Sequence, residues 1–240
     1  MIVGVTLVSG PALGKLIVTP RPLFDYRNMF LLTDDELLAG PILDCPAGAS
    51  PFAAQVRARG GRAVSVDPIY GPRAEVAARV AADLAHVHDW LTAGPIGLDW
   101  SYLGSADAML RAFEVSADFF LADYAEGGPH YVMAELPELP FADDEFALTV
   151  SSHLLFTYAE IVSYDEHVAY LLEMVRVTSG EVRVCPVADP AGVPYPRLDD
   201  VRAELGKHGI TTELRTARSA YSKGGDDVLV CREDSETQTP

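Results

Sequence analysis

The sequence predicts an α/β protein built on a mostly parallel sheet with helices on both faces. Apolar strand-like runs alternate with helical patterns along the chain. Several of these runs are continuously apolar rather than alternating, as expected for strands buried on both faces. The chain has 240 residues, of which 49% are hydrophobic and 22% are charged. This composition predicts one folded domain with a sizeable core.

Six apolar runs have the length and composition of strands: residues 42–45, 63–67, 131–134, 146–151, 182–187 and 228–231. After the first of them, Ser50 is predicted to cap a helix, with Pro51 at its first position and Gly60 at its end. Apolar residues at a 3.6-residue period predict further helices over 76–91, 110–124, 168–175 and 198–205.

One connection is unusually long. About sixty residues separate the second strand from the third, roughly twice what a single crossover helix needs. The sequence therefore predicts a helical insertion over about residues 71–129. The main domain is expected over 41–231, preceded by an N-terminal segment and lid helix over 1–40 and followed by a flexible tail over 232–240.

Charge and cysteine content narrow the class of partner. The 18 basic and 35 acidic residues give a net charge of −17, which disfavours nucleic acid and anionic membranes. The three cysteines are far apart and form no CxxC pair, so we expect buried thiols and neither disulfides nor a metal site. The first residues lack the basic n-region of a signal peptide, which predicts a cytoplasmic protein.

The turn after the first strand is the first candidate binding element. Gly48 would let a ligand approach the backbone, and Asp67 follows it by nineteen residues at the end of the second strand. A carboxylate there can accept both hydrogens of a ribose diol, which suits an adenosine-containing cofactor. Asp44 lies inside an apolar strand end, so it is either hydrogen-bonded to the loop amides or used by a ligand amine.

With these residues the stretch from Leu38 to Val187 resembles the class I S-adenosylmethionine-dependent methyltransferases. Their glycine loop is similar to residues 43–50, Leu-Asp-Cys-Pro-Ala-Gly-Ala-Ser, although Pro46 and Ser50 stand where the family has glycines. The family also has a carboxylate that is followed by Leu-Pro-Phe and then by the apolar fourth strand. In this sequence the similar residues are Glu135, Leu139-Pro140-Phe141 and Leu148-Thr149-Val150.

The resemblance implies a Rossmann-like fold with a seven-stranded sheet and S-adenosylmethionine as cofactor. The cofactor-binding residues that it implies are Asp44, Pro46, Ala47, Gly48, Ala49, Asp67, Pro68, Ile69, Glu135, Leu136 and Ser151. Among them, Gly48 and Ala49 would line the methionine portion and Asp67 would hold the ribose. The implied activity is methyl transfer to a small-molecule acceptor by in-line displacement, in a monomer or homodimer.

Other residues are candidates for the acceptor side. His153 follows the fourth strand and can serve as a general base for a hydroxyl or amine acceptor. Tyr26, Phe30, Trp100 and Tyr158 are predicted to contact substrate or form a lid. His86 and His88 are two apart on a predicted helix and therefore face different directions, so they form no paired metal ligands.

Two alternatives remain open at this point. The altered glycine loop and the lack of an unmistakable base are consistent with a methyltransferase-like protein that binds a cofactor or partner without chemistry. An acid nineteen residues after a glycine turn also suits a nicotinamide-dependent oxidoreductase, although the GxGxxG pattern is absent.

Overall fold

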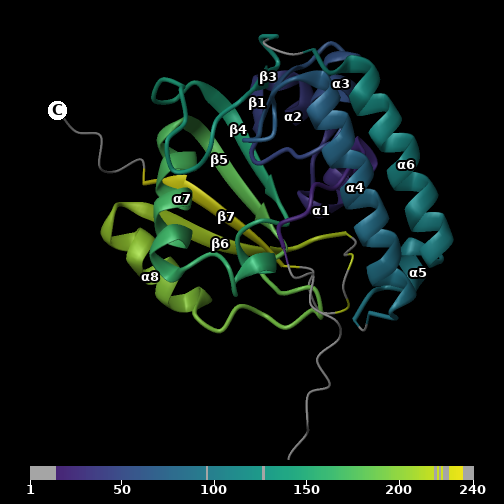
Figure 1. The fold of residues 1–240 in the computed structure, drawn as a ribbon. Coiled ribbons are helices and arrows are strands. Elements are labelled where there is room, and N and C mark those ends of the chain that lie inside the picture. The colour runs from purple at the N-terminus through teal and green to yellow at the C-terminus, as the bar shows by residue number, and fades with distance from the viewer. Residues whose placement is uncertain are drawn as a thin grey trace, which may run out of the picture.

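A computed structural model describes residues 15–95, 97–125, 128–218, 221, 223 and 227–234. At its centre lies one seven-stranded sheet with the strand order β3-β2-β1-β4-β5-β7-β6 (Figure 1). The strands are β1 Pro41–Asp44, β2 Arg62–Val66, β3 Tyr131–Val132, β4 Phe146–Ser152, β5 Thr178–Cys185, β6 Ile210–Thr216 and β7 Asp227–Glu233. Among these described residues there is no helix with the length and apolar character that a bilayer crossing requires.

The sheet is parallel except at one edge. β1 pairs in parallel with β2 and β4, β2 with β3, and β4 with β5, whereas β7 is antiparallel to both β5 and β6. The order 3-2-1-4-5 is that of a Rossmann-type doubly wound sheet, which confirms the predicted fold class. The direction of winding reverses between β1 and β4, and ligands bind such sheets outside the carboxyl ends of the strands at this point.

All six predicted strand runs contain strands, and a seventh strand was missed. β6 has the sequence ITTELRT and is mostly exposed, so it lacks the apolar run on which the predictions were based. β3 has only two residues, and β5 begins at Thr178, four residues before the predicted run. β7 extends to Glu233, so the predicted tail loses its first two residues to a strand.

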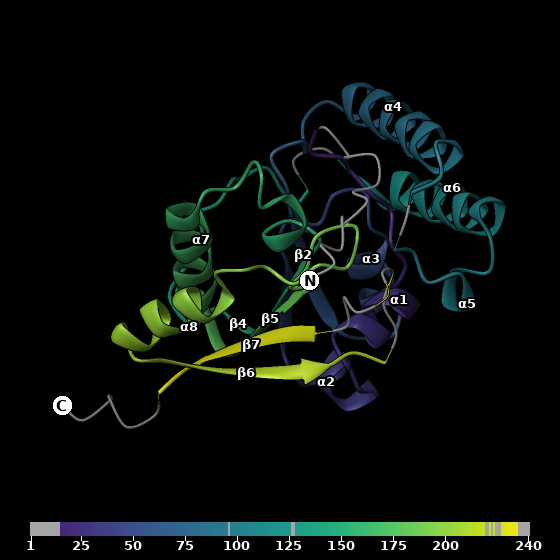
Figure 2. The same cartoon turned by 90° about the horizontal axis from the view of Figure 1, so that it is seen from below.

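Helices cover both faces of the sheet. On one face, α7 Tyr164–Arg176 and α8 Leu198–Lys207 pack against a cluster that includes Leu43, Val182 and Leu229. On the other face, α1 Leu23–Met29 and α3 Phe52–Arg57 pack on a cluster that includes Ile42 and Val150. Figure 2 shows these two groups of helices on opposite sides of the strands.

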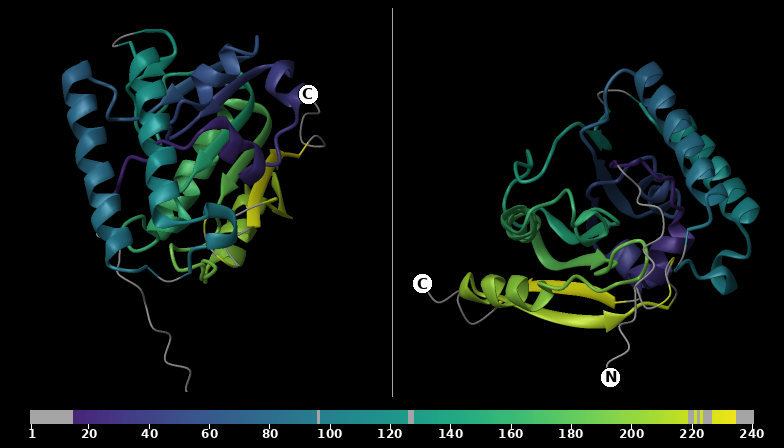
Figure 3. Two further views of the ribbon diagram at one scale, coloured as in Figure 1. Left: turned by 90° about the vertical axis from the view of Figure 1, so that its right-hand side faces the viewer. Right: turned by 60° about the horizontal axis from the view of Figure 1, so that its bottom comes forward.

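The predicted helical insertion is present between β2 and β3. It consists of α4 Arg73–Thr92, the short α5 Trp100–Leu103 and α6 Ala106–Asp123. α4 and α6 run side by side along the outside of the molecule (Figure 3). Their apolar faces contribute Val76, Val80 and Phe120 to a cluster that also holds Ala47 and Ala49 of the turn after β1. The insertion is therefore packed beside the carboxyl ends of β1 and β2.

Local capping explains where the first helices begin. Thr33 caps α2 Asp34–Ala39 through a capping box with Glu36. α3 starts one residue later than predicted, because Pro51 is its N-cap residue rather than its first position. The Ser50 hydroxyl still accepts a hydrogen bond from the Phe52 amide at 3.1 Å.

Candidate functional site

A cavity of about 390 Å³ opens at the carboxyl ends of β1, β2 and β4. This volume lies within the range of small-molecule and cofactor sites. The turn after β1 and the end of β2 form one wall, and residues that follow β3 and β4 form another. The residues from these elements that line it are Cys45, Pro46, Ala47, Gly48, Asp67, Pro68, Ile69, Ala134, Glu135, Leu136, Ser152 and His153.

The turn after β1 is tied to the end of β2. Gly48 has a φ of +57°, a conformation that favours glycine, and its amide donates to Oδ2 of Asp67 at 2.8 Å. The Tyr70 hydroxyl donates to the Gly48 carbonyl at 2.8 Å. A Cβ at Gly48 would lie 3.4 Å from the carbonyl oxygen of Thr19, so the backbone at Thr19 passes close to the turn.

Asp67 is a buried carboxyl that faces the cavity with an exposure of 6%. Its Oδ1 accepts from the Ile69 amide at 3.1 Å, while Oδ2 accepts from Gly48. Burial raises the pKa of Asp67 to about 6, although these two amides and the Arg79 charge oppose the shift. Each carboxylate oxygen has a second lone pair, so Asp67 can accept further hydrogen bonds from a ligand.

Asp44 lies behind the cavity wall rather than in it. Its Oδ1 accepts from the Tyr26 hydroxyl at 3.0 Å, and its Oδ2 is buried without a hydrogen-bond partner. Burial raises the pKa of the Asp44 carboxyl well above its usual range. The hydrogen-bond partner of Asp44 is thus a tyrosine from α1 rather than the loop amides, and its second oxygen remains without a partner.

His153 lies at the end of β4, where its ring is half-buried and its backbone has a φ of +51°. Its amide donates to the Cys185 carbonyl at 2.9 Å, and its Nδ1 lies 3.0 Å from the Ser152 hydroxyl. Burial, together with the positive charge of Arg21, holds the pKa of His153 well below its ordinary value. Both causes disfavour the protonated form of the imidazole.

Residues 15–21, here called the N-terminal strap, contribute a further wall of the cavity. Leu16, Ile17, Val18, Thr19 and Arg21 all line the cavity. Asp83 of α4 anchors the strap, because its oxygens accept from Lys15 Nζ at 2.6 Å and from the Val18 amide at 2.9 Å. This placement was not predicted, because residues 15–21 have no helical or strand period.

The structure brings together most of the predicted cofactor residues. Pro46, Ala47, Gly48, Asp67, Pro68, Ile69, Glu135 and Leu136 line the cavity, as do His153, Tyr26 and Tyr158. Ala49 and Ser151 are fully buried and do not line it, and Ser152 takes the place predicted for Ser151. The roles of these residues stay predictions.

Two predicted lid residues lie elsewhere. Phe30 is fully buried in the core with Tyr26 and Phe52, because the end of α1 turns inward against α3. Trp100 begins α5 on the surface and lines neither this cavity nor the smaller one beside it, which Trp90 lines instead.

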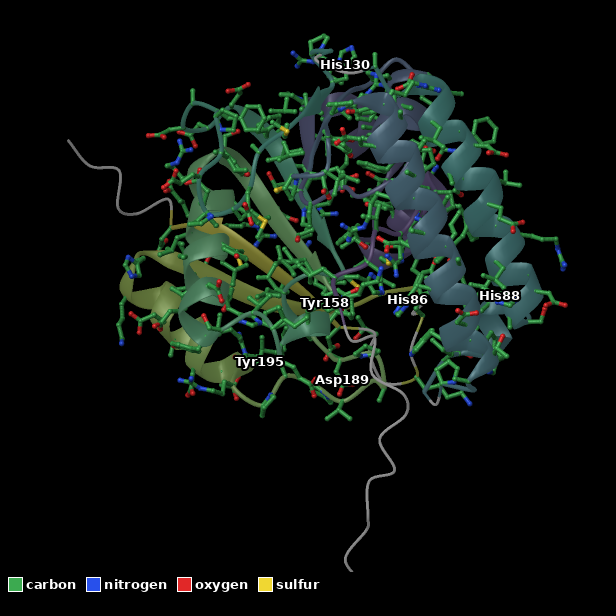
Figure 4. All side chains as sticks on the ribbon, viewed as in Figure 1. His86, His88, His130, Tyr158, Asp189 and Tyr195 are labelled. Carbon is green, nitrogen blue, oxygen red and sulfur yellow. The ribbon has the colours of Figure 1, made fainter. Side chains whose placement is uncertain are left out.

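Within the described residues, the histidines and cysteines form no metal-binding group. Figure 4 shows His86 and His88 on different sides of α4, as predicted from their spacing. The three cysteines are free and buried, as predicted. No group of three or more His, Cys, Asp or Glu side chains that could hold a metal ion occurs in the described part of the chain.

Comparison with known sequences finds one relative without a known role. An uncharacterized protein of Methanocaldococcus jannaschii is 28% identical over 218 residues, which are 90% of this chain and 96% of that protein. No protein-family model matches the chain.

Comparison with solved structures finds methyltransferases at low identity. The 1,6-didemethyltoxoflavin-N1-methyltransferase of Burkholderia thailandensis, solved with S-adenosylhomocysteine, is 14% identical with a TM-score of 0.43, covering 82% of this chain and 72% of that one. A SAM-dependent methyltransferase from Aquifex aeolicus is 13% identical with a TM-score of 0.41, covering 81% of each chain. One from Methanosarcina mazei is 10% identical with a TM-score of 0.43, covering 91% and 99%. At these values, function has to be inferred from the residues of the cavity itself.

Proposed function

We propose that this chain binds S-adenosylmethionine in the larger cavity and transfers its methyl group to a small-molecule acceptor. The observation that carries the proposal is the pairing of Gly48 with Asp67 at the switch point of the sheet. The turn presents backbone to the cavity, and the acid that holds it has lone pairs left for a ribose diol. The proposal makes Asp67 the ribose-binding residue.

The remaining walls of the cavity suit the other parts of the cofactor. Ile69 and Leu136 offer apolar surface for the adenine ring, and Glu135 offers an acceptor for its amino edge. We assign the methionine ammonium to the end lined by Tyr26 and Cys45. Behind that end, the unpartnered carboxyl oxygen of Asp44 favours a positive charge.

When bound, the cofactor supplies a methyl group already activated by its sulfonium. The chain then has to orient the acceptor and keep the cavity dry. The N-terminal strap lines the cavity and would shield a bound cofactor from water on that side. His153 would take the proton of a hydroxyl or amine acceptor that receives the methyl group.

A small acceptor fits both the charge of the chain and the size of the cavity. The net charge of −17 opposes the approach of nucleic acid. The volume of about 390 Å³ is that of a small-molecule site. The acceptor is therefore proposed to be a free small molecule, and a monomer or homodimer suffices for this activity.

Calorimetric titration with S-adenosylmethionine, S-adenosylhomocysteine, NAD and NADP tests the proposal. We expect micromolar binding of the first two, loss of that binding in Asp67→Ala, and unchanged binding in a matched control, Asp118→Ala, on the exposed face of α6. Preference for NAD or NADP would support an oxidoreductase instead. Binding of none of the four would leave a protein that uses this fold without the cofactor.

Catalysis is tested separately from binding. Once an acceptor is found, His153→Asn is expected to lower kcat by roughly 10²–10⁴-fold while S-adenosylhomocysteine affinity stays within twofold. An unchanged kcat would show that transfer proceeds without this base.

A further inference from the structure

A second, smaller cavity of about 60 Å³ adjoins the first. A water-sized group takes roughly 10–15 Å³ on this measure, so the cavity holds about four to six such groups, the size of one six-membered ring. Figure 4 shows Tyr158 and Asp189, which both line it, on the same side of the molecule. The residues that line both cavities are Ile17, Thr19, Arg21, His153 and Tyr158.

The walls of this second cavity are apolar and aromatic. Phe113 and Tyr221 pack near each other with ring centroids 6.2 Å apart, and Trp90 adds a third ring. The Tyr221 hydroxyl donates to the buried Asp25, which fixes this ring in place. Aliphatic side chains complete the walls: Val87, Leu98 and Met109. Such walls suit a planar aromatic ring.

One positive charge lies where the two cavities meet. Arg21 is 7% exposed, and its guanidinium carbon lies 4.6 Å from the ring centre of Tyr221 and 5.8 Å from that of Phe113. It donates one hydrogen bond to the Thr19 hydroxyl, and its Nε has no partner. Within the described part of the chain, no carboxylate forms an ion pair with Arg21. A buried charge without a counter-ion is strongly unfavourable, so this site lacks an anion.

The carboxylates of this region are already engaged. Both oxygens of Asp25 accept hydrogen bonds, one from Tyr102 and one from Tyr221. Asp189 holds its own loop, because its Oδ1 accepts from the amides of Ala191 and Val193 at 2.9 Å each. Among the described residues, neither of these carboxylates forms an ion pair with Arg21, so its guanidinium is available to an anionic ligand.

We propose that the second cavity takes the methyl acceptor, and that this acceptor is a single-ring aromatic acid whose carboxylate pairs with Arg21. The ring lies among Trp90, Phe113 and Tyr221, and His153 faces it from the junction with the larger cavity. Calling this ligand the acceptor rests on the proposed function, whereas the prediction that the cavity binds it does not.

Arg21 also lines the larger cavity, so the carboxylate of the methionine portion is a second source of the same anion. The aromatic contacts of Arg21 favour the first source. Phe113 and Tyr221 line only the smaller cavity, and the guanidinium lies against both of them. The two sources predict different losses when Arg21 is changed.

The experiment compares acids with their neutral amides. The probes are 2- and 3-hydroxybenzoate and the corresponding hydroxybenzamides, titrated by calorimetry into the full chain with and without saturating S-adenosylhomocysteine. We expect at least one acid to bind the unmodified chain at least tenfold more tightly than its amide. Arg21→Gln should weaken that acid roughly 30-fold or more, while the matched surface variant Arg62→Gln, at the opposite end of β2, leaves it unchanged.

Separate results decide the two proposals. Equal affinities for acid and amide, or binding of neither acid, would overturn the inference without needing any variant. A loss of S-adenosylhomocysteine affinity in Arg21→Gln with unchanged acid affinity would assign Arg21 to the cofactor and also overturn it. Acid binding that persists in a chain that fails to bind S-adenosylhomocysteine would uphold the anion site and contradict the proposed function. If Arg21→Gln does not fold, Arg21→Lys tests whether a retained charge retains the preference for the acid.

Discussion

Replacing Asp67 by Asn should separate its two contributions, to cofactor binding and to the turn. In Asp67→Asn, the amide side chain can still accept from one of the two backbone amides, of Gly48 or Ile69, that now donate to it. A hydrogen bond to a charged group contributes about 1.5–3 kcal/mol. The loss of two ribose bonds to the carboxylate should therefore weaken S-adenosylhomocysteine by about 3 kcal/mol or more, which is roughly 150-fold or more.

Lowering the pH should weaken cofactor binding but stabilise the unliganded fold. The pKa of Asp67 is about 6 in the folded chain, against 3.8 for an ordinary aspartate. Since ribose hydroxyls donate to the ionised form, affinity should fall about tenfold between pH 7 and pH 5. The unliganded fold should instead gain about 1 kcal/mol from this group over the same interval, because the raised pKa makes the folded state bind the proton more tightly.

Calorimetry at pH 5, 6 and 7 tests the predicted loss of affinity at low pH. Urea unfolding of the unliganded protein at the same pH values tests the predicted gain in stability. Asp67→Asn removes the titrating group, so its affinity and stability should lose these two pH dependences. Binding of S-adenosylhomocysteine by Asp67→Asn with the affinity of the unmodified chain would refute the assignment of the ribose to this residue.

Three further changes follow from the same contacts. Gly48→Ala should lower the unfolding free energy by about 1 kcal/mol because of the positive φ at this position, and it should also weaken S-adenosylhomocysteine binding. Gly60→Ala, at a φ of +90° with open space around it, should lower stability alone. Thermal melts and calorimetry would measure the two effects. Asp83→Ala removes the anchor of Val18 and should make the N-terminal strap cut faster in limited proteolysis; an unchanged cleavage rate would show that other contacts hold it. Glu181 is hydrogen-bonded to three arginines on the sheet, which lower its pKa to about 2. Its stabilisation is therefore present above pH 4.5 and lost as the pH falls toward 2. Glu181→Gln should lower the unfolding free energy by about 2–3 kcal/mol at pH 7 and reduce the loss of stability between pH 4.5 and pH 2.

The sequence predicted the parts of the site that depend on local spacing. Gly48 lies in the turn after β1 and Asp67 directly follows β2. Parallel neighbours bring such strand ends to the same edge of a sheet, so the separation of nineteen residues sufficed to place the two together. Glu135 and Leu136 follow β3 by the same logic. The strands β1, β2, β4 and β7 were found because burial on both faces makes them continuously apolar.

Long-range contacts could not be predicted in this way. Arg21, Phe113 and Tyr221 come from three distant segments, and no period or spacing links them. Trp90 and Trp100 flank the same loop, and only the packing of α4 against the sheet decides that Trp90 faces a cavity while Trp100 lies on the surface. β6 was missed because an exposed edge strand needs few apolar residues.

The most direct test of the account is a crystal structure of the chain with S-adenosylhomocysteine. We expect the ribose hydroxyls to lie within hydrogen-bond distance of Asp67 and the adenine to lie between Ile69 and Leu136. The sulfur should point toward His153 and the smaller cavity. A ligand bound elsewhere, or in this cavity with its ribose away from Asp67, would contradict it.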